Sequence, residues 1–472
     1  MSITTAAPQT DDGTAQRIPL SYNQQFLRAF DKGETDGAFG HRHTLVCGWR
    51  VTGAVDTDAL QRALDDVVER HEVLRTAVVG DDEGGHQVVH PPAPVALEVT
   101  DLPDADDTPR DVRAEEFLND LDAAPYPVRE LPHLRAFLGR FDTTDAVLVL
   151  ATHHTSTDAW SLQVLMRDLV AAYRARAAGA TADLGEVAQY REFAHYQQEN
   201  ADSSRIDQAR AYWRERLAGA EITGITSDRP AQADLPSAYG VHRFVFDTEL
   251  SKKVVEFARA ERCTPFMVLA AAYSVLLRRR TGTTDVVFPT FSSGRYEERF
   301  ADSVGPFFNF VPIRIDTGDC TTLADVLDRS RAACVGAYRN EIPFARIAED
   351  SPALLAPFAD GFLAVVAFEV LQSAFPLDGE DGGDGKDGKD GKGTDGPRFT
   401  EIRRRTLSQQ VSSAIPDGGL WAMDVLPGGE LAGSLKFDHN RFDERTAREL
   451  VEQFRHLLTV LSGAPQTPLA KL

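Results

Sequence analysis

Hydrophobic and polar residues recur along the chain with a helical period in some segments and as short apolar runs in others. Apolar residues three and four apart predict helices over 20–30, from a capping residue at Asp56 or Thr57, and over 443–461. The same spacing predicts a helix that ends near Gly179. The two best-defined apolar faces comprise Leu60, Leu64, Val67, His71 and Leu74 after Asp56, and Leu162, Leu165, Leu169, Ala172 and Tyr173 before Gly179.

Short apolar runs between these helices indicate strands. They cover 44–51, 75–79, 146–152, 285–289 and 310–315. Thr264 and Pro265 open a further helix, because a capping residue followed by proline is typical of a helix start. Gly282 suits the C-terminal end of that helix. The mixture of helices and strands throughout the chain predicts an α/β fold.

Small and polar residues at 177–185 divide the chain into two expected lobes. We expect a flexible tail at 1–17, an N-terminal lobe at 18–180 and a C-terminal lobe at 181–472. Residues 378–397, DGEDGGDGKDGKDGKGTDGP, have no apolar residue except the closing proline and predict a disordered surface loop between two strands. A calcium loop is the alternative, but the EF-hand spacing and its closing glutamate are absent.

Composition narrows the classes of function. The 472 residues include 50 Lys and Arg against 72 Asp and Glu, a formal net charge of −22. This acidity argues against a nucleic-acid partner, because binding to phosphates depends on excess basic residues. No apolar run approaches the roughly 18 residues of a membrane span, and no secretory signal is recognisable. The four cysteines lack the spacing of a zinc site or a disulfide framework. We therefore expect a cytoplasmic protein with no membrane partner and no metal.

A polar segment at 153–160 joins the strand at 146–152 to the following helix, which is a common place for chemistry. Within it, His153, His154 and Asp158 form the pattern HHxxxD. A histidine can accept a proton at neutral pH, and an aspartate one turn further on can hold a loop or an imidazole through charge-assisted hydrogen bonds. A metal site would need further ligands, and no second cluster is near in the sequence. On this motif alone, two buried structural histidines are the other interpretation.

Six segments match motifs in a fixed order over nearly the whole chain. They are LSYNQQ at 20–25, RHEVLRT at 70–76, HHTSTDAWS at 153–161, YREFA at 190–194, VGPFFNFVPIR at 304–314 and NEIPF at 340–344. This set resembles the motifs of the condensation domains of nonribosomal peptide synthetases. The chain is identified as a member of that family, within the HHxxxD acyltransferase superfamily.

The resemblance implies two chloramphenicol-acetyltransferase-like lobes in a V-shaped pseudodimer, with the active site in a tunnel between them. By the same resemblance, His154 deprotonates or orients the attacking amine or alcohol, while His153 and Asp158 shape the loop. Asp158 is expected to pair with an arginine, for which Arg295 is the first candidate and Arg75 the second.

Departures from the family's motifs leave the type of substrate open. Ala159 stands where the family usually has glycine, and no RDxSRxPL segment is recognisable near 351–361. Trp160 and Ser161 are candidate substrate-binding residues, with packing under the helix as the alternative for Trp160. Asn309 is a third candidate, for which packing of a buried strand is the favoured interpretation.

The expected function is that of a free-standing condensation enzyme, because neither an adenylation signature nor a carrier-protein serine is recognisable. It would move an acyl or aminoacyl group from the phosphopantetheine arm of an acyl- or peptidyl-carrier protein to a small amine or alcohol, with no bound cofactor. The basic clusters at 278–280 and 403–405 are candidate docking sites for that carrier protein.

Two other functions stay open. A coenzyme-A-dependent HxxxD acyltransferase would carry a DFGWG motif, of which DGGLW at 417–421 is a distorted version. A catalytically silent docking platform usually lacks the second histidine, which is present here. Epimerisation is disfavoured by Leu162, which stands where that branch has tryptophan, and heterocyclisation by the two intact histidines.

Overall fold

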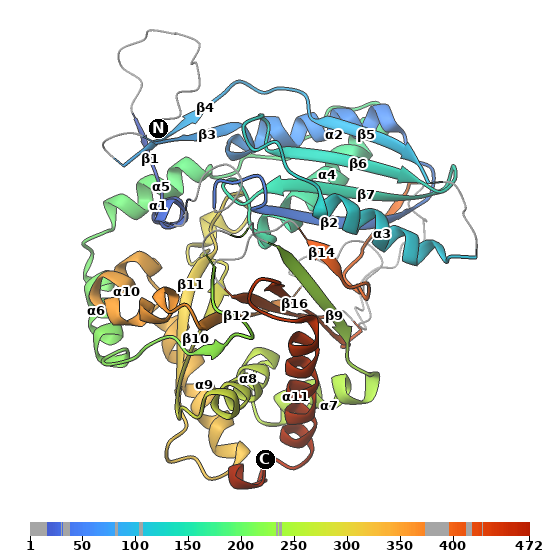
Figure 1. Cartoon of the computed structure of the whole chain (residues 1–472). Helices are drawn as coiled ribbons and strands as arrows, with labels where there is room; N and C mark the ends of the chain where they lie inside the picture. Colours follow the sequence, from blue (N-terminus) through green and yellow to red (C-terminus); the bar gives the residue numbers. More distant parts are fainter. Residues whose placement is uncertain are drawn as a thin grey trace.

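The computed structural model describes residues 17–29, 31, 38–80, 84–102, 107–232, 235, 238–372, 396–411, 418–426 and 428–472. The predicted tail at 1–17 and the predicted loop at 378–397 fall almost entirely outside these residues. The described residues form two α/β lobes, each built around a large sheet, and Figure 1 shows the lobes one above the other. The predicted α/β class is confirmed.

The first lobe is built on a five-stranded sheet with the strand order β13-β2-β7-β6-β5. Leu148 and Leu150 of β7 pack in the core beneath α2 and α4, whereas Val147 and Val149 pack against α3. Burial on both faces explains why this strand is apolar at consecutive positions. The elements are β2 (Thr44–Thr52), α2 (Thr57–Arg70), β5 (Ala96–Asp101), α3 (Arg110–Ala123), β6 (Leu134–Arg140), β7 (Asp145–His153), α4 (Ala159–Ala177) and β13 (Arg398–Glu401).

A three-stranded sheet of order β1-β4-β3 and two short helices complete this lobe. The predicted strand at 75–79 begins one residue later, because Arg75 is the last residue of a 3₁₀ turn. The elements are β1 (Ile18–Pro19), α1 (Tyr22–Ala29), η1 (Glu72–Arg75), β3 (Thr76–Val79) and β4 (His86–Val89).

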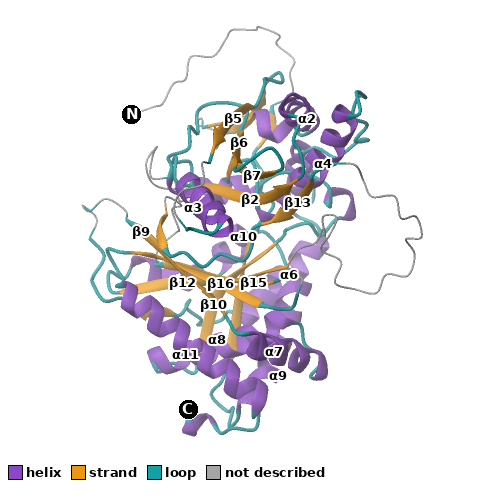
Figure 2. Cartoon of the chain, turned by 90° about the vertical axis from the view of Figure 1, so that its right-hand side faces the viewer, coloured by secondary structure: helices purple, strands orange, loops and turns teal. Residues whose placement is uncertain are grey.

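The second lobe contains a six-stranded sheet with the order β14-β9-β16-β15-β12-β8 and a separate antiparallel pair, β10 and β11. The helices α7, α8 and α11 cover the face of the six-stranded sheet that points away from the first lobe (Figures 1 and 2). Its strands are β8 (Gly224–Thr226), β9 (Tyr239–Val245), β10 (Asp285–Ser292), β11 (Asn309–Asp316), β12 (Leu363–Gln372), β14 (Gln409–Val411), β15 (Gly419–Val425) and β16 (Leu431–Asp438). Its helices are α6 (Ser204–Arg216), α7 (Thr248–Ala260), α8 (Pro265–Thr281), α9 (Leu323–Arg339), α10 (Phe344–Asp350), η3 (Pro352–Ala359), α11 (Glu444–Gly463) and η4 (Leu469–Lys471). The helices α5 (Tyr190–Glu199) and η2 (Glu298–Phe300) pack on the core of the first lobe instead, through Tyr190, Phe193 and Phe300.

The helix ends follow the predicted capping chemistry. The Asp56 side chain accepts a hydrogen bond from the Ala59 N–H at 2.9 Å and caps α2. Thr264 caps α8, and Gly282 ends that helix with a φ of 76°, a conformation that glycine adopts without strain. Among the described residues, no single helix has the length and apolar composition of a membrane span, and only α7 and α8 together, bent by 108°, pass that test.

Residues 402–408 connect the two lobes, because β13 pairs with β2 in the first lobe and β14 pairs with β9 in the second. The connection is held by ion pairs and hydrogen bonds. Arg403 donates to Asp424 of β15 at 2.6 Å, and the Glu115 carboxylate of α3 accepts the backbone N–H groups of Thr406 and Leu407 at 2.6 and 2.7 Å. Arg403 is thus engaged inside the molecule, which argues against the predicted docking role of the 403–405 cluster.

Candidate active site

The HHxxxD segment lies where β7 ends and α4 begins, facing the second lobe. His153 is the last residue of β7, and Asp158 is the N-cap of α4, with its carboxylate accepting the Ser161 N–H at 2.8 Å. A buried strand therefore holds one end of the turn and a capped helix holds the other. This local structure fixes where His154 lies.

His153 is fully buried and has its hydrogen-bonding capacity satisfied by protein groups. Its Nε2 lies 2.9 Å from the carbonyl oxygen of Gly40, which can only accept, so Nε2 carries the proton. Its Nδ1 accepts from the Thr155 hydroxyl at 2.8 Å. Burial, reinforced by the neighbouring His133, holds the pKa of His153 well below its usual range. His153 is therefore a neutral structural group that anchors the turn.

His154 differs from His153 because the described part of the chain supplies no hydrogen-bond partner for its Nδ1, which is buried. Its ring lies between two aromatic rings, that of His43 with a centroid separation of 4.4 Å and that of Phe308 at 5.3 Å. Burial lowers the pKa of His154 to about 3, and the charge of Lys436 contributes to the decrease. At neutral pH the ring is uncharged and can accept a hydrogen bond.

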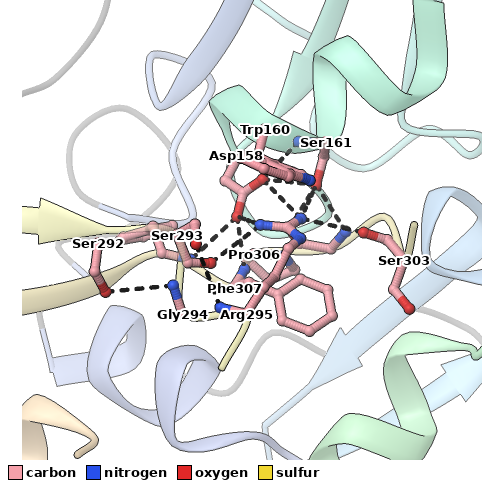
Figure 3. Close-up of polar contacts among 12 residues, drawn as sticks. Asp158, Trp160, Ser161, Ser292, Ser293, Gly294, Arg295, Ser303, Pro306 and Phe307 are labelled. Atoms are coloured by element: carbon pink, nitrogen blue, oxygen red, sulfur yellow. Dashed lines mark hydrogen bonds and ion pairs between the residues drawn. The ribbon is translucent and has the colours of Figure 1, made fainter. Parts of the chain in front are cut away.

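Asp158 forms a bidentate ion pair with Arg295, and both side chains are almost completely buried, at 4% and 2% exposure (Figure 3). The two guanidinium nitrogens donate to the carboxylate at 2.8 and 3.0 Å. The backbone N–H groups of Phe307 and Phe308 donate to the same carboxylate, each at 3.1 Å. Asp158 thus ties the turn of the first lobe to residues 303–309 of the second lobe, which we call the crossing segment. Arg295, the first candidate partner for Asp158, therefore forms the expected ion pair.

Other predicted motifs converge on the crossing segment. The Asn23 side chain, from the motif at 20–25, donates to the carbonyl oxygens of Phe307 and Phe308 at 2.9 and 2.6 Å. The Tyr190 hydroxyl, from the motif at 190–194, donates to the carbonyl oxygen of Pro306 at 3.0 Å. These motifs therefore hold Phe308 against His154 and need not touch substrate themselves.

Arg75, the second candidate for the ion pair, does not reach Asp158. Its side chain donates instead to the carbonyl oxygen of His90. Arg75 ends the 3₁₀ turn before β3, and His90 follows β4, the strand that pairs with β3. The other motif residues at 70–76 are also structural. His71 and Arg70 both contact the Asp168 carboxylate of α4, at 2.9 and 3.0 Å. This motif joins α2 to α4.

The three predicted substrate-binding side chains have their polar groups engaged in the protein, and a role in substrate binding stays a prediction. The Ser161 hydroxyl donates to Asp158 at 2.7 Å and is fully buried. The indole N–H of Trp160 donates to the carbonyl oxygen of Ala301 at 2.9 Å. The Asn309 amide bonds Glu341, Ile342 and Phe344. The geometry gives all three a scaffold role.

Sequence reasoning missed His43 and Phe308 as neighbours of the candidate catalytic histidine. His43 precedes β2, and its backbone carbonyl oxygen accepts the backbone N–H of His154 at 3.0 Å, so strand pairing brings the two residues together. A single histidine before a strand gives no signal of this contact. Within the residues that the structure describes, no group of three or more His, Cys, Asp or Glu side chains could hold a metal ion.

Comparisons with known proteins decide the family. A family model described as Condensation domain matches residues 15–472. The chain belongs to the condensation-domain family. It is 31% identical over 451 residues, 95% of its length, to one of the linear gramicidin synthase subunits of Brevibacillus parabrevis. The chain spans about 8% of the length of the gramicidin synthase subunits that it matches over nearly its whole length.

Two solved structures resemble this condensation domain over its whole fold. SgcC5 from Streptomyces globisporus is 41% identical, with a TM-score of 0.87 over 95% of this chain and 100% of that one. The X-domain from teicoplanin biosynthesis is 25% identical, with a TM-score of 0.75 over 98% of each chain. Condensation domains consist of two chloramphenicol-acetyltransferase-like lobes, so that part of the fold prediction is confirmed. Membership supports a condensation-type role in natural-product biosynthesis, a role that such domains perform with carrier proteins.

Proposed function

We propose that this chain is a catalytically active condensation enzyme. It transfers an acyl or aminoacyl group from the phosphopantetheine thioester of a carrier protein to a small-molecule amine or alcohol. The observation that carries this proposal is the contrast between the two histidines: both ring nitrogens of His153 have partners in the protein, whereas the Nδ1 of His154 has no partner among the described residues.

The chemistry of His154 fits this reaction. A neutral imidazole accepts a hydrogen bond from the acceptor N–H or O–H and orients its lone pair toward the thioester carbonyl carbon. The new C–N or C–O bond forms and the C–S bond breaks. The thiolate that leaves takes up the proton lost by the acceptor and becomes the free thiol of the arm. Because the pKa of His154 is low, the ring remains uncharged over the working pH range and holds that proton only transiently.

The scaffold around His154 supports the geometry that acyl transfer needs. His43 and Phe308 pack against the ring and restrict its rotation, and the Asp158–Arg295 pair fixes the turn that carries it. Apolar and aromatic neighbours also limit the access of water, which would otherwise hydrolyse the thioester. These residues position the catalytic group and need not bind substrate.

The most informative relative favours an alcohol acceptor. SgcC5, 41% identical to this chain, was crystallised with (R)-1-(2-naphthyl)-1,2-ethanediol, which carries two hydroxyl groups. An alcohol is less nucleophilic than a free amine, so ester formation depends more on the hydrogen bond to His154. We therefore expect His154→Ala to slow transfer to an alcohol more than transfer to an amine.

The test is an intact-mass assay with a panel of acyl-loaded carrier proteins and paired amine and alcohol acceptors. Wild type, His154→Ala and the control His456→Ala are compared, since His456 is an exposed histidine on α11. We expect loss of the acyl mass from the carrier protein and a matching product with wild type and the control. His154→Ala should lower the rate by about 10²-fold or more.

The alternative outcome also has a definite meaning. If the panel remains acylated with wild type while the carrier protein binds the enzyme, the chain is a docking platform; the X-domain, which this chain resembles, forms a complex with OxyB. If His154→Ala is as active as wild type, the chain catalyses transfer but His154 is not its catalytic residue. The first result would refute the transfer activity, and the second would refute only the catalytic role of His154.

A further inference from the structure

The antiparallel pair β10 and β11 places three phenylalanine rings on one face. Phe291 of β10 lies directly opposite Phe310 of β11 in the register. Because side chains alternate along a strand, Phe308, two residues before Phe310, shares that face and lies diagonally across from Phe291. The ring centroid of Phe291 is 4.6 Å from that of Phe310 and 6.1 Å from that of Phe308. The three rings therefore form one continuous surface, which we call the phenylalanine face.

The phenylalanine face ends at His154. The ring of Phe308 meets the imidazole edge to face, with a centroid separation of 5.3 Å and an angle of 67° between the ring planes. The backbone of Phe308 is held by the first lobe, because its N–H donates to Asp158 at 3.1 Å and its carbonyl oxygen accepts from Asn23 at 2.6 Å. Direct contact and fixed backbone hydrogen bonds thus join the aromatic surface to the candidate catalytic group.

Part of this surface is not covered by the protein. Phe291 and Phe308 are only partly buried, whereas the next residue on the chain before Phe308, Phe307, is fully buried in the core of the first lobe. His154 is also partly exposed, and its Nδ1 has no partner among the described residues. Aromatic surface that remains in contact with water gains free energy when a ligand covers it. An apolar surface beside one convergent polar atom is the usual composition of a small-molecule site.

The acceptor is the substrate that this surface is placed to bind. Under the proposed function, the attacking O–H or N–H of the acceptor donates to the Nδ1 of His154. The atoms next to the attacking atom must then lie beside the imidazole, where the ring of Phe308 is. The acyl group lies beyond the attacked carbonyl carbon, so the acceptor separates it from the imidazole. The contact between Phe308 and His154 therefore favours the acceptor over the acyl group as the occupant of the phenylalanine face.

We infer that Phe291 and Phe308 bind an aromatic ring of the acceptor substrate while its hydroxyl or amine group donates to His154. This inference rests on the proposed function and specifies its acceptor class as aryl alcohols and aryl amines with the ring close to the reacting group. Aromatic rings attract one another beyond the effect of burial, because the negative face of one ring meets the positive edge of another. A phenyl ring should therefore bind more tightly than a saturated ring of similar size.

Three acceptor probes separate aromatic attraction from burial alone. They are 2-phenylethanol, 2-cyclohexylethanol and ethanol, which has no ring. Titration followed by ligand NMR measures affinity without turnover, and acyl transfer gives KM and kcat separately. Transfer is measured with carrier protein that bears either a benzoyl or a hexanoyl group, so that an effect on the acyl group is detected as well.

Four variants are compared with wild type. Phe291→Leu removes an aromatic ring that makes no ring contact with His154, and Phe291→Tyr restores an aromatic ring at the same position. Phe308→Leu removes the ring that packs against the imidazole. Phe266→Leu is the matched control, because Phe266 of α8 is also a partly buried phenylalanine that packs on the core of the second lobe.

We expect wild type to bind 2-phenylethanol about 2- to 10-fold more tightly than 2-cyclohexylethanol. Phe291→Leu should remove that preference and raise the KM for 2-phenylethanol by the same factor, with kcat nearly unchanged. Phe291→Tyr should retain the preference. Phe308→Leu should remove the preference and also lower kcat, because Phe308 holds the ring of His154 as well. The control should resemble wild type.

The inference is overturned if wild type binds the phenyl and cyclohexyl alcohols equally, or if the preference survives in both leucine variants. A lower melting temperature of Phe291→Leu with equal weakening of all three probes would assign Phe291 to the scaffold. A changed preference between benzoyl and hexanoyl donors, with acceptor preference intact, would assign the face to the acyl group and also overturn the inference. A phenyl preference in binding without transfer from any carrier protein would support the aromatic site and refute the proposed function.

Discussion

Removal of the Asp158–Arg295 ion pair should destabilise the fold as well as lower the acyl-transfer activity. The Asp158 carboxylate accepts six hydrogen bonds: Oδ1 accepts two from Ser161 and one from Arg295, and Oδ2 accepts one each from Arg295, Phe307 and Phe308. The guanidinium of Arg295 also lies over the ring of Phe307, 4.2 Å from its centroid. The pair is therefore a central connection between the two lobes.

The two single substitutions should differ in magnitude. Arg295→Ala leaves a buried carboxylate that keeps four neutral donors, so we expect a loss near the lower end of the about 3 to 5 kcal/mol typical of a broken buried pair. Asp158→Ala leaves a buried guanidinium and removes the acceptor for the N–H groups of Phe307 and Phe308, and should cost about 5 kcal/mol. Asp158→Asn should cost nearly as much, because both oxygens face donors and the amide NH₂ group would meet one of them.

Urea unfolding of wild type, Asp158→Ala, Arg295→Ala and the double variant measures these free energies, with tryptophan fluorescence and circular dichroism as two probes of the transition. We expect the double variant to lose about 2 to 3 kcal/mol less than the sum of the single losses, because each residue is costly mainly when its partner remains buried alone. Additive losses within about 0.5 kcal/mol would refute the coupling. An Asp158→Ala protein that is fully stable but inactive would give Asp158 a direct chemical role.

Three other positions in the structure support further predictions. Gly294→Ala should lower the melting temperature by several degrees, measured by calorimetry, because Gly294 has a φ of 63° and an added Cβ would lie 1.9 Å from the Phe307 carbonyl oxygen. Asn309→Ala should cost about 1 to 3 kcal/mol in urea unfolding by orphaning the Phe344 N–H, with KM unchanged; a raised KM would restore its substrate role. Burial lowers the pKa of His133 to about 4, below the 6.5 of the unfolded chain. The unfolded state therefore binds more protons, and His133 alone should contribute a fall in stability of about 3 kcal/mol from pH 7 to pH 4, a contribution that His133→Gln removes.

The sequence predicted helices and strands best where interactions between residues close in the chain control the structure. The apolar face after Asp56 and the pairing of Thr264 with Pro265 each identified a helix and its cap, because capping depends on residues within one turn. The run at 146–152 identified β7, since a strand buried on both faces is apolar at consecutive positions. Resemblance of the motifs then identified the family and, with it, the two-lobed architecture.

Roles within the site depended on contacts between residues far apart in the chain. The pattern HHxxxD alone does not distinguish His153 from His154; the difference arises from the Gly40 carbonyl oxygen, which satisfies one ring, and from Phe308, which packs against the other. The polar groups of Ser161 and Asn309 are likewise engaged by distant segments, contacts that the sequence alone does not indicate.

Residue patterns alone were thus enough to give several of the helices and strands, the family and the three residues of the HHxxxD motif, since helical periodicity and capping act over a few residues. The packing of the two lobes was needed to show that Arg295, 137 positions after Asp158, forms its ion pair, and that Phe308 lies against His154. Burial sets the pKa of His154, and burial depends on which surfaces the two lobes bring together.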